Sequence, residues 1–414
     1  MPVYVIATLD TKGREAAFVR DRLKAAGIET RLVDAGSHRP PAVPADVSRE
    51  AVFAAAGTTA AAVLERADRG EAVNAAARGA AALARQWHAD GLVEGILGLG
   101  GSAGTTIGTS AMRALPLGVP KLMVSTLASG QVRQYVGDKD ILMLNSIVDI
   151  LGINRISRLI LGEAAAAMAG MVAANRKHPD AGQTDRPLIA ASMFGVTTPC
   201  VEAAKEYLEN RGYELLVFHA TGNGGQAMES LIRDGLIAGV LDVTTTELAD
   251  ELVGGILSAG PDRLTAAGQA GVPQVISVGA IDMVNFGPRA SVPEKFADRK
   301  FHVHNANVTL TRTTVDENRQ LGEIIGRKAA AARGPTAIFL PLQGLSAIDA
   351  PGKPFEDAAA RDALYTAIRA HCGPVECRSV DAHINDPAFA QLLAQRLVDM
   401  IQAAAPRPQE SPRG

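Results

Sequence analysis

Short apolar runs and stretches with helical periodicity alternate along this chain, and that alternation constrains the fold more than any other feature. The first half contains apolar runs at 3–10, 92–100 and 121–127. Apolar runs separated by helices are typical of a parallel sheet whose two faces are covered by helices. We therefore predict an α/β fold. The helices predicted in this half lie at 14–27, about 69–89 and about 141–175.

The same alternation restarts in the second half, at the apolar run 187–194, after a polar stretch at 176–186 that is rich in chain breakers. With 414 residues the chain is longer than one hydrophobic core usually supports. We therefore predict two Rossmann-like domains, each a mostly parallel sheet with helices on both faces, at 1–180 and 187–405. The polar tail at 406–414 is expected to be disordered.

Composition narrows the classes of partner. Acidic and basic residues are interspersed and give a net charge of -3, so no basic surface is expected for nucleic acid or for an anionic membrane. Aromatic residues make up 4% of the chain, which leaves little for stacking on bases. A small-molecule ligand or a protein partner fits this composition better.

The three cysteines, Cys200, Cys372 and Cys377, show no paired metal-ligand spacing, which favours a reducing compartment. The N-terminus lacks the basic start and long apolar stretch of a signal peptide, and we see no apolar run long enough to span a membrane. We therefore expect a cytoplasmic protein.

A glycine-rich segment, GLGGSAGTTIGTS at 98–110, follows a predicted strand and opens a predicted helix. Its free amides and the positive end of the helix dipole would face an anion. It is not a Walker P-loop, because no Gly-Lys-Ser/Thr follows, and it comes too late in its domain for a typical dinucleotide fingerprint. A tight turn that needs glycine only for its conformation is the alternative. If the segment binds an anion, glycines would let the backbone approach it closely and hydroxyl groups would donate hydrogen bonds to it. The residues of these two kinds are Gly100, Gly101, Ser102, Gly104 and Thr105.

The end of the first predicted strand carries a second candidate motif, with Asp10, Thr11 and Lys12 in sequence. The carboxylate could hold a magnesium ion and the lysine a phosphate. Asp10 or Thr11 could equally cap the first helix, and the two roles are compatible.

Polar residues also gather at predicted strand ends in the second half, beside another glycine turn at 219–229. They suggest a site for a small polar substrate, because ligands bind beyond the carboxyl ends of parallel strands. The candidate catalytic residues are His219, Asp242, Asp282, His302 and His304. The last two are spaced to point the same way on one strand, but no third ligand at fixed spacing supports a zinc site.

Two helix starts are also recognisable in the second half. Thr198 and Pro199 would place Cys200 in the first turn of a helix, where the dipole favours a thiolate, although a lone cysteine is also a common small core residue. Thr314 and Glu317 have the spacing of a capping box.

Together these segments resemble a known family. The stretches GLGGSAGTT, VSTLASGQVRQYVGDKDI, SMFGVTTPCV, VFHATGNGGQAME, LDVTTTELADELVGGILSAGPDRL, GAIDMVNFGP and HNANVTLTRTT are similar, in order, to the bacterial and plant family that includes the N-terminal domain of the tomato mosaic virus resistance protein. The resemblance spans about residues 3 to 400. It implies two Rossmann-like domains, ATP binding with Mg²⁺, and a homodimer. In the plant member the domain binds a viral replication protein, which looks like a lineage-specific use.

Carried over by position, the resemblance assigns nucleotide binding to the glycine-rich residues named above and to Thr8, Asp10, Thr11 and Lys12. Two positions depart from the family pattern. Ala103 stands where glycine is common, and Asp138 stands where threonine is common, which adds negative charge to a loop that could face phosphates.

The sequence thus leads to an ATP-binding protein, with the hypothesis that the second domain closes a cleft over a small polar metabolite and acts on it. A nucleotide-responsive module that presents a surface to a protein partner, without catalysis, is the alternative. A third possibility is an enzyme for a phosphorylated or carboxylate substrate in which ATP occupies the glycine cradle fortuitously. The sequence assigns no metal ligand beyond an ion bound with the nucleotide.

Overall fold

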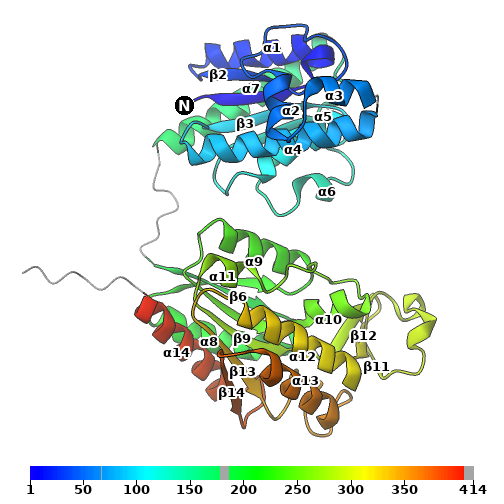
Figure 1. The fold of residues 1–414 in the computed structure, drawn as a ribbon, viewed down its shortest axis with the longest axis vertical. Coiled ribbons are helices and arrows are strands. Elements are labelled where there is room, and N and C mark those ends of the chain that lie inside the picture. The colour runs from blue at the N-terminus through cyan, green and yellow to red at the C-terminus, as the bar shows by residue number, and fades with distance from the viewer. Residues whose placement is uncertain (67, 178–185, 405–414) are drawn as a thin grey trace, which may run out of the picture. The chain divides into compact units, whose positions relative to one another are not determined.

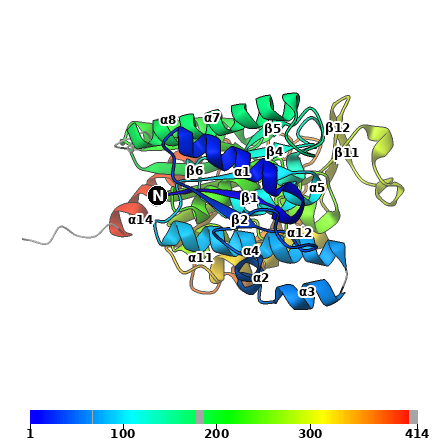
Figure 2. The same cartoon turned by 90° about the horizontal axis from the view of Figure 1, so that it is seen from above.

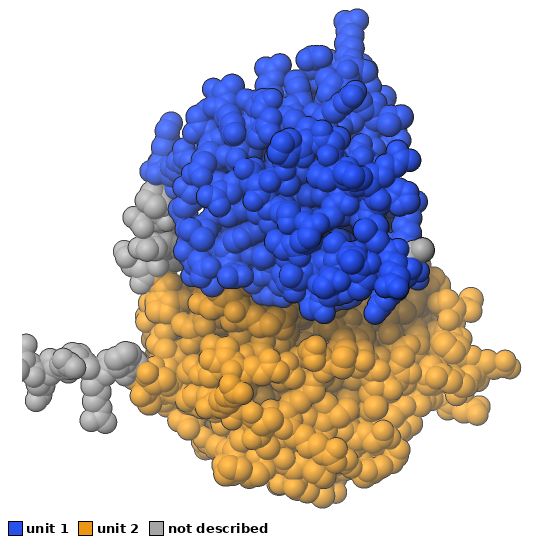
Figure 3. All heavy atoms as spheres, turned by 45° about the horizontal axis from the view of Figure 1, so that its top comes forward, with its two compact units in different colours: residues 1–183 blue, residues 184–414 orange. Residues whose placement is uncertain are grey.

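The computed structural model describes residues 1–66, 68–177 and 186–404 (Figure 1). The chain forms two compact units that divide between residues 183 and 184 (Figure 3). Most of the predicted linker and all of the predicted tail lie outside the described residues. Each unit is described by itself below.

Unit 1 contains a five-stranded parallel sheet in the order β2-β1-β3-β4-β5. The chain passes from β1 to β2, which pairs with one edge of β1, and later returns to form β3, which pairs with the other edge. The strand order therefore reverses between β1 and β3. The strands are β1 (Val3–Ala7), β2 (Thr30–Asp34), β3 (Gly95–Gly100), β4 (Lys121–Ser125) and β5 (Leu142–Asn145).

Helices cover both faces of this sheet (Figure 2), because successive strand residues point to opposite sides. Val3 and Val5 pack with α1 and α7, whereas Tyr4 and Ile6 pack with α2, α4 and α5. Tyr4 stacks on Trp87 of α4 with ring centroids 3.8 Å apart. The helices are α1 (Leu9–Ala25), α2 (Arg49–Ala55), α3 (Ala60–Arg66), α4 (Arg69–Ala89), α5 (Ser102–Arg113), α6 (Arg133–Val136) and α7 (Arg155–Lys177).

Unit 2 contains a six-stranded parallel sheet in the order β14-β13-β9-β8-β6-β7, which reverses between β6 and β8. One face packs against α8 and α14, and the other against the remaining helices. Its strands are β6 (Leu188–Met193), β7 (Glu214–His219), β8 (Gly239–Thr244), β9 (Gln274–Gly279), β13 (Thr336–Pro341) and β14 (Glu376–Val380). Its helices are α8 (Thr198–Glu209), α9 (Asn223–Arg233), α10 (Thr246–Val253), α11 (Ala266–Ala270), α12 (Val315–Ala330), α13 (Ala358–His371) and α14 (Pro387–Ala404).

A three-stranded antiparallel sheet, in the order β10-β12-β11, interrupts the alternation between β9 and α12. Its strands are β10 (Met283–Phe286), β11 (Phe301–Asn305) and β12 (Val308–Arg312). The sequence pattern did not distinguish these strands from loops at the end of the parallel sheet.

The predicted fold class, two Rossmann-like domains with mostly parallel sheets and helices on both faces, is confirmed. The helix expected over about 141–175 is wrong at its start, because it begins with β5 and becomes helical only at Arg155. An apolar run of this length does not distinguish a strand from a buried helix by its periodicity. The capping box is confirmed, since the Glu317 amide donates to Thr314 Oγ1 at 3.2 Å and the Thr314 amide to Glu317 Oε2 at 2.9 Å.

Candidate functional site

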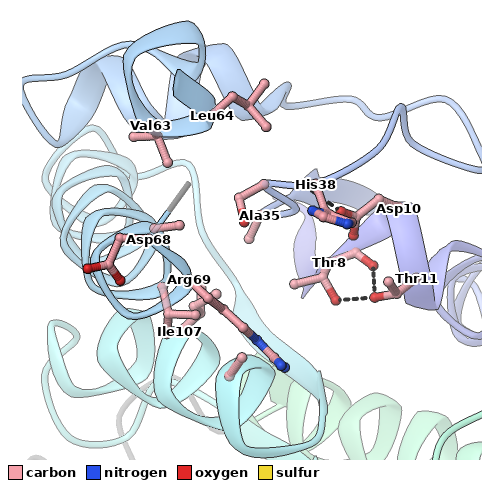
Figure 4. A pocket seen from close by; sticks show the side chains of 14 residues that line it. Thr8, Asp10, Thr11, Ala35, His38, Val63, Leu64, Asp68, Arg69 and Ile107 are labelled. Atoms are coloured by element: carbon pink, nitrogen blue, oxygen red, sulfur yellow. Dashed lines mark hydrogen bonds between the residues drawn. The ribbon is translucent and has the colours of Figure 1, made fainter. Parts of the chain in front are cut away.

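A cavity of about 670 Å³ opens in unit 1 beyond the carboxyl ends of β1 and β2, beside the first turns of α4 and α5 (Figure 4). Its position next to the reversal of strand order is where open α/β sheets bind ligands. Its volume falls within the range of roughly 300–1,000 Å³ that small-molecule sites occupy.

The cavity has an apolar part and a polar part. The apolar lining comes from α3, α4, α5 and the end of β2: Val63, Leu64, Ala72, Val73, Ala103, Ile107 and Ala35. The polar lining comes mainly from the strand ends and the start of α4: Thr8, Asp10, Thr11, Ser37, His38, Asp68 and Arg69. An apolar slot joined to a few polar groups is the usual composition of a small-molecule site.

The turn between β3 and α5 contributes the start of a helix. Gly101 is the N-cap residue, and no side chain caps this helix. The Thr105 amide makes the first bond back into the turn, to the Gly101 carbonyl at 2.8 Å. Within the described residues, the three amides before it, from Ser102 to Gly104, donate no hydrogen bond. Such amides, together with the helix dipole, favour an anion.

The glycines of this turn do not all have the same reason to be glycine. A Cβ added to Gly100 would lie 2.8 Å from the Gly104 Cα, and one added to Gly104 would lie 3.0 Å from the Leu99 carbonyl oxygen. These two glycines are therefore required by close packing of the turn. Gly101 has φ of -80°, and its added Cβ would meet nothing nearer than Thr126 Oγ1 at 3.6 Å. The fold leaves the glycine at 101 unexplained.

Asp10 lies in the first turn of α1, whose N-cap residue is Thr8 and not Asp10 or Thr11, and it joins this turn to the loop after β2. Its Oδ2 accepts hydrogen bonds from the amides of His38 at 3.0 Å and Arg39 at 3.2 Å. Its Oδ1 is buried and, within the described residues, has no hydrogen-bond partner. A Cβ on Gly36 would approach this oxygen to 2.6 Å, so the loop requires a glycine there. Asp10 therefore holds the loop through Oδ2, and its Oδ1 could still coordinate a cation or accept a hydrogen bond.

The other residues predicted to bind a cofactor divide into two groups. Thr8 and Thr11 line the cavity, and their hydroxyl oxygens lie 2.8 Å apart. Lys12 turns away, because its Nζ donates to the Ile150 carbonyl. Thr105 is buried, and its hydroxyl donates to the Gly101 carbonyl while lying 2.7 Å from Ser125 Oγ. Of the residues predicted to bind a cofactor, only Thr8, Asp10 and Thr11 are among the described residues that line the cavity. Helix α5 lines it through Ala103 and Ile107, and the remaining predicted residues do not line it: Lys12, Gly100, Gly101, Ser102, Gly104 and Thr105.

Arg69 and His38 are cavity residues that sequence reasoning missed. In Figure 4 the Arg69 side chain crosses the cavity from α4 toward the start of α5. Arg69 is exposed and, within the described part of the chain, has no ion-pair partner. Asp68 before it caps α4, accepting from the amides of Gly70 at 2.8 Å and Glu71 at 3.0 Å. In the sequence the pair resembles any ordinary helix start, so no signal singled out the arginine.

The glycine turn of unit 2, between β7 and α9, is already occupied by a side chain. Glu247 Oε1 accepts hydrogen bonds from the amides of Gly222 at 2.7 Å and Gly225 at 3.1 Å. Its other oxygen accepts from Arg263 Nε at 2.6 Å, and both side chains are fully buried. The protein's own carboxylate thus fills the position that an anion would take.

Arg263 also holds Asp242, one of the predicted catalytic residues. The Asp242 oxygens accept from Arg263 Nη1 and Nη2 at 2.5 Å and 2.7 Å, and Ser192 Oγ donates to the carboxylate at 2.6 Å. Glu229 is a third carboxylate on this arginine, 3.4 Å from Nη1. A buried cation shared by three carboxylates joins β8, α9 and α10 and serves the fold.

Asp282 lies in a separate buried cluster after β9. Ser346 Oγ donates to its Oδ2 at 2.8 Å, and its Oδ1 has no partner within the described residues. The pKa of Asp282 is raised to about 7, chiefly by burial and then by the neighbouring Asp349 carboxylate, with Arg312 opposing both. Burial likewise raises the pKa of Asp250 to about 7.

The predicted histidines lie on other elements. His219 is exposed at the end of β7, with its ring 5.4 Å from that of Phe194. His302 and His304 lie on β11 of the antiparallel sheet, where an irregularity between Val303 and Asn305 breaks the alternation. Within the described residues, no hydrogen bond joins any two of the five predicted catalytic side chains. The structure does not assemble them into one constellation.

Cys200 does lie in the first turn of α8, but Thr197 is the N-cap residue and Thr198 begins the helix. The thiol is fully buried, and burial raises its pKa to about 12. It is therefore a protonated core residue at neutral pH. Within the described residues, no cluster of three or more His, Cys, Asp or Glu side chains could hold a metal ion.

Comparison with known proteins identifies the family. The two domain models of an uncharacterised protein family, UPF0261, match residues 1–177 and 186–401. The chain belongs to this family. A UPF0261 protein of Clostridium tetani is 48% identical over 97% of this chain and 99% of its own length. A UPF0261 protein of Mesorhizobium japonicum is 46% identical over 95% of this chain and 97% of its own length.

The tomato relatives confirm the resemblance inferred from the motifs. The ToMV resistance protein Tm-1 of Solanum lycopersicum is 45% identical over 74% of this chain and 41% of that protein. The ToMV susceptible protein tm-1 is 46% identical over the same shares. Because the resistance protein and the susceptible protein are similar to this UPF0261 chain to within one per cent, overall identity does not distinguish ToMV resistance from susceptibility.

Solved structures show only distant likeness. A UDP-N-acetylglucosamine 2-epimerase from Rickettsia bellii covers 98% of this chain and 97% of its own, with 8% identity and a TM-score of 0.23. A likeness at this level carries no argument about the ligand.

Proposed function

We propose that unit 1 of this UPF0261 protein binds ATP in the cavity beyond β1 and β2. The observation that carries the proposal is the start of α5, where three free amides begin a helix beside the exposed Arg69. The family resemblance of the glycine-rich and first-strand motifs points to the same nucleotide.

The polar end of the cavity suits the phosphates. Free helix amides bind an anion through hydrogen bonds and the dipole, and a guanidinium can form paired bonds to phosphate oxygens. Packing within the fold does not require a glycine at position 101. Binding of an anion would require one, because any side chain at this position would lie in front of these amides. Lys12 takes no part in this arrangement, because it is bonded to the Ile150 carbonyl.

The apolar end suits the adenine ring. Val63, Leu64, Val73 and Ile107 come from three helices and all line the cavity. A flat heterocycle between aliphatic side chains buries apolar area without needing a charged partner.

Asp10 fits the magnesium ion that accompanies ATP. Mg²⁺ is usually held by one or two carboxylates together with phosphate oxygens and water. The unpartnered Oδ1 of Asp10 would supply one such ligand beside the cavity. The ion would neutralise phosphate charge, while Asp10 keeps its bonds to the loop after β2.

A second candidate function, beside an enzyme, is a nucleotide-responsive module that acts on a protein partner without catalysis. The supporting observation is that Asp242 is sealed by Arg263, whereas the three candidate histidines lie on β7 and β11. A small polar metabolite as the substrate of an enzyme remains a prediction.

Calorimetry with ATP and Mg²⁺ tests the proposal, using Gly101→Val against the matched variant Gly130→Val. An added Cβ has its nearest neighbour at 3.6 Å at both positions, so the Cβ of neither valine requires the fold to move. We expect Gly101→Val to weaken ATP binding at least about tenfold, because the side chain covers the free amides. Gly130→Val should bind like the natural protein. Absence of ATP binding by the natural protein, or equal binding by both variants, would contradict the proposal.

A further inference from the structure

The sheet of unit 1 sets four strand ends in a row along the edge where the cavity opens. The order β2-β1-β3-β4 places the end of β4 next to the end of β3 and farthest from that of β2. Neighbouring strands lie roughly 4.8 Å apart, so the row from β2 to β4 is about 14 Å long. A nucleoside triphosphate with an extended phosphate chain is long enough to reach along such a row.

The cavity covers only the first part of this row. Its lining includes Ala35 and Ser37 after β2, Thr8 and Asp10 after β1, and Ala103 in the first turn of α5. The apolar lining includes the end of β2 and, among the described residues, none that follows β4. A nucleotide whose base occupies the apolar part therefore extends its phosphates along the row toward α5 and β4.

Thr126 is the first residue after β4 and lies beside the turn that begins α5. A Cβ added to Gly101, the N-cap residue of α5, would have Thr126 Oγ1 as its nearest neighbour, at 3.6 Å. The Thr126 side chain is half-buried, and within the described residues its hydroxyl forms no hydrogen bond. A hydroxyl beside free amides can donate to an anion that those amides hold.

The backbone around Thr126 is fixed by its neighbours. The Thr126 amide donates to the Gly100 carbonyl at 3.4 Å, which keeps the end of β4 against the turn after β3. Ser125 is buried, and its Oγ lies 2.7 Å from Thr105 Oγ1 and accepts from the Leu127 amide at 3.0 Å. Thr126 therefore keeps one position relative to the start of α5, as recognition of a single phosphate group requires.

We propose that Thr126 binds the terminal phosphate of the nucleotide, so that the site selects triphosphates over shorter nucleotides. The phosphate chain runs from β1 across the start of α5 and ends at β4. The first two phosphates lie beside the α5 amides and Arg69, whose side chain points toward that helix start, and the third reaches Thr126 (Figure 4). The inference rests on the proposed function, because it assigns the far end of the same ligand.

Calorimetry with adenosine, AMP, ADP and ATP, each with Mg²⁺, tests the inference on the natural protein and on Thr126→Val. We expect the natural protein to bind ATP at least about tenfold more tightly than ADP, because a hydrogen bond to a charged group contributes that much. Valine has the shape of threonine without the hydroxyl. Thr126→Val should therefore lose most of the preference for ATP and bind ADP and adenosine as the natural protein does.

Thr126→Ser is the matched control, since it keeps the hydroxyl and should keep the preference for ATP. Thr126→Ala carries the same expectation as the valine variant and replaces it if the second methyl group disturbs the loop.

Three results would overturn the inference and leave the ATP site in place. They are equal binding of ATP and ADP by the natural protein, a Thr126→Val variant that keeps the full preference, and a variant that loses affinity for ATP, ADP and adenosine alike. Absence of ATP binding by the natural protein would instead contradict the proposed function, and this inference with it.

Discussion

The two glycine turns of this chain look alike in sequence and differ in what faces their amides. The turn before α5 follows β3, a strand at the reversal of strand order, and its amides from Ser102 to Gly104 donate no hydrogen bond within the described part of the chain. The turn before α9 follows β7, the edge strand of its sheet, and Glu247 occupies its amides. A glycine turn followed by a helix can therefore bind an external anion only where no carboxylate of the protein already accepts hydrogen bonds from its amides.

The largest expected effect is on stability, and it comes from removing Glu247 from the turn before α9. Glu247→Ala removes a carboxylate from the fully buried Arg263 and should lower the free energy of unfolding by about 3–5 kcal/mol, the usual cost of breaking a buried ion pair. Urea unfolding followed by circular dichroism measures this change. Glu202→Ala, at an exposed residue of α8, serves as the control and should change little.

The same variant sharpens the comparison. With Glu247 absent, the amides of Gly222 and Gly225 face Arg263 with no anion between them. Inorganic phosphate should then raise the melting temperature of Glu247→Ala by more than that of the natural protein, because the turn before α5 is present in both proteins and the emptied turn before α9 only in the variant. If phosphate affects both proteins equally, Glu247 does not act as the internal anion of this turn.

A smaller effect is expected from Arg69 in the open turn. Arg69→Gln should weaken ATP binding about tenfold, because a hydrogen-bonded charge opposite the phosphates is lost, and should leave adenosine binding unchanged. Arg78→Gln, at an exposed residue of the same helix, is the matched control. Titration calorimetry with both ligands measures the difference, and a parallel loss of adenosine affinity would show that Arg69 shapes the cavity rather than holding phosphate.

The smallest expected effect concerns the buried acids of unit 2. The folded pKa of Asp282 is raised to about 7, above the value of about 4 expected in the unfolded chain. The folded state thus keeps a proton that the unfolded state releases, so this contribution to stability is complete below about pH 4 and is lost as pH rises to about 7.

Asp282→Asn removes that titration while keeping an acceptor for Ser346. We expect the variant to be more stable than the natural protein at pH 8, by about 1 kcal/mol or more, and to show a flatter pH dependence between 4 and 7. Thermal melts of the two proteins across this range measure the difference. A curve parallel to that of the natural protein would mean that Asp282 is ionised in the fold.

Part of the site was predictable from its segments. The end of β1 and the turn before α5 were both predicted to bind ligand, and of the residues named there Thr8, Asp10 and Thr11 line the cavity, whereas the predicted residues of the turn before α5 do not. Arg69 was not predictable, because an arginine after a capping aspartate is common at helix starts. His302 and His304 were misplaced, because the short strands of a local hairpin resemble the loops that follow strands of the main sheet.

Local periodicity by itself determined the α/β class, the order of strands and helices, and helix starts such as the capping box at Thr314. These features depend on residues a few positions apart, and the family motifs depend on the same short segments. Which glycine turn stays open was decided only by the tertiary structure. Glu247 meets Gly222 across 25 positions of chain, and Arg69 reaches the start of α5 from a different helix. Such contacts arise from how helices pack on a sheet, which the spacing of residues along one segment does not encode.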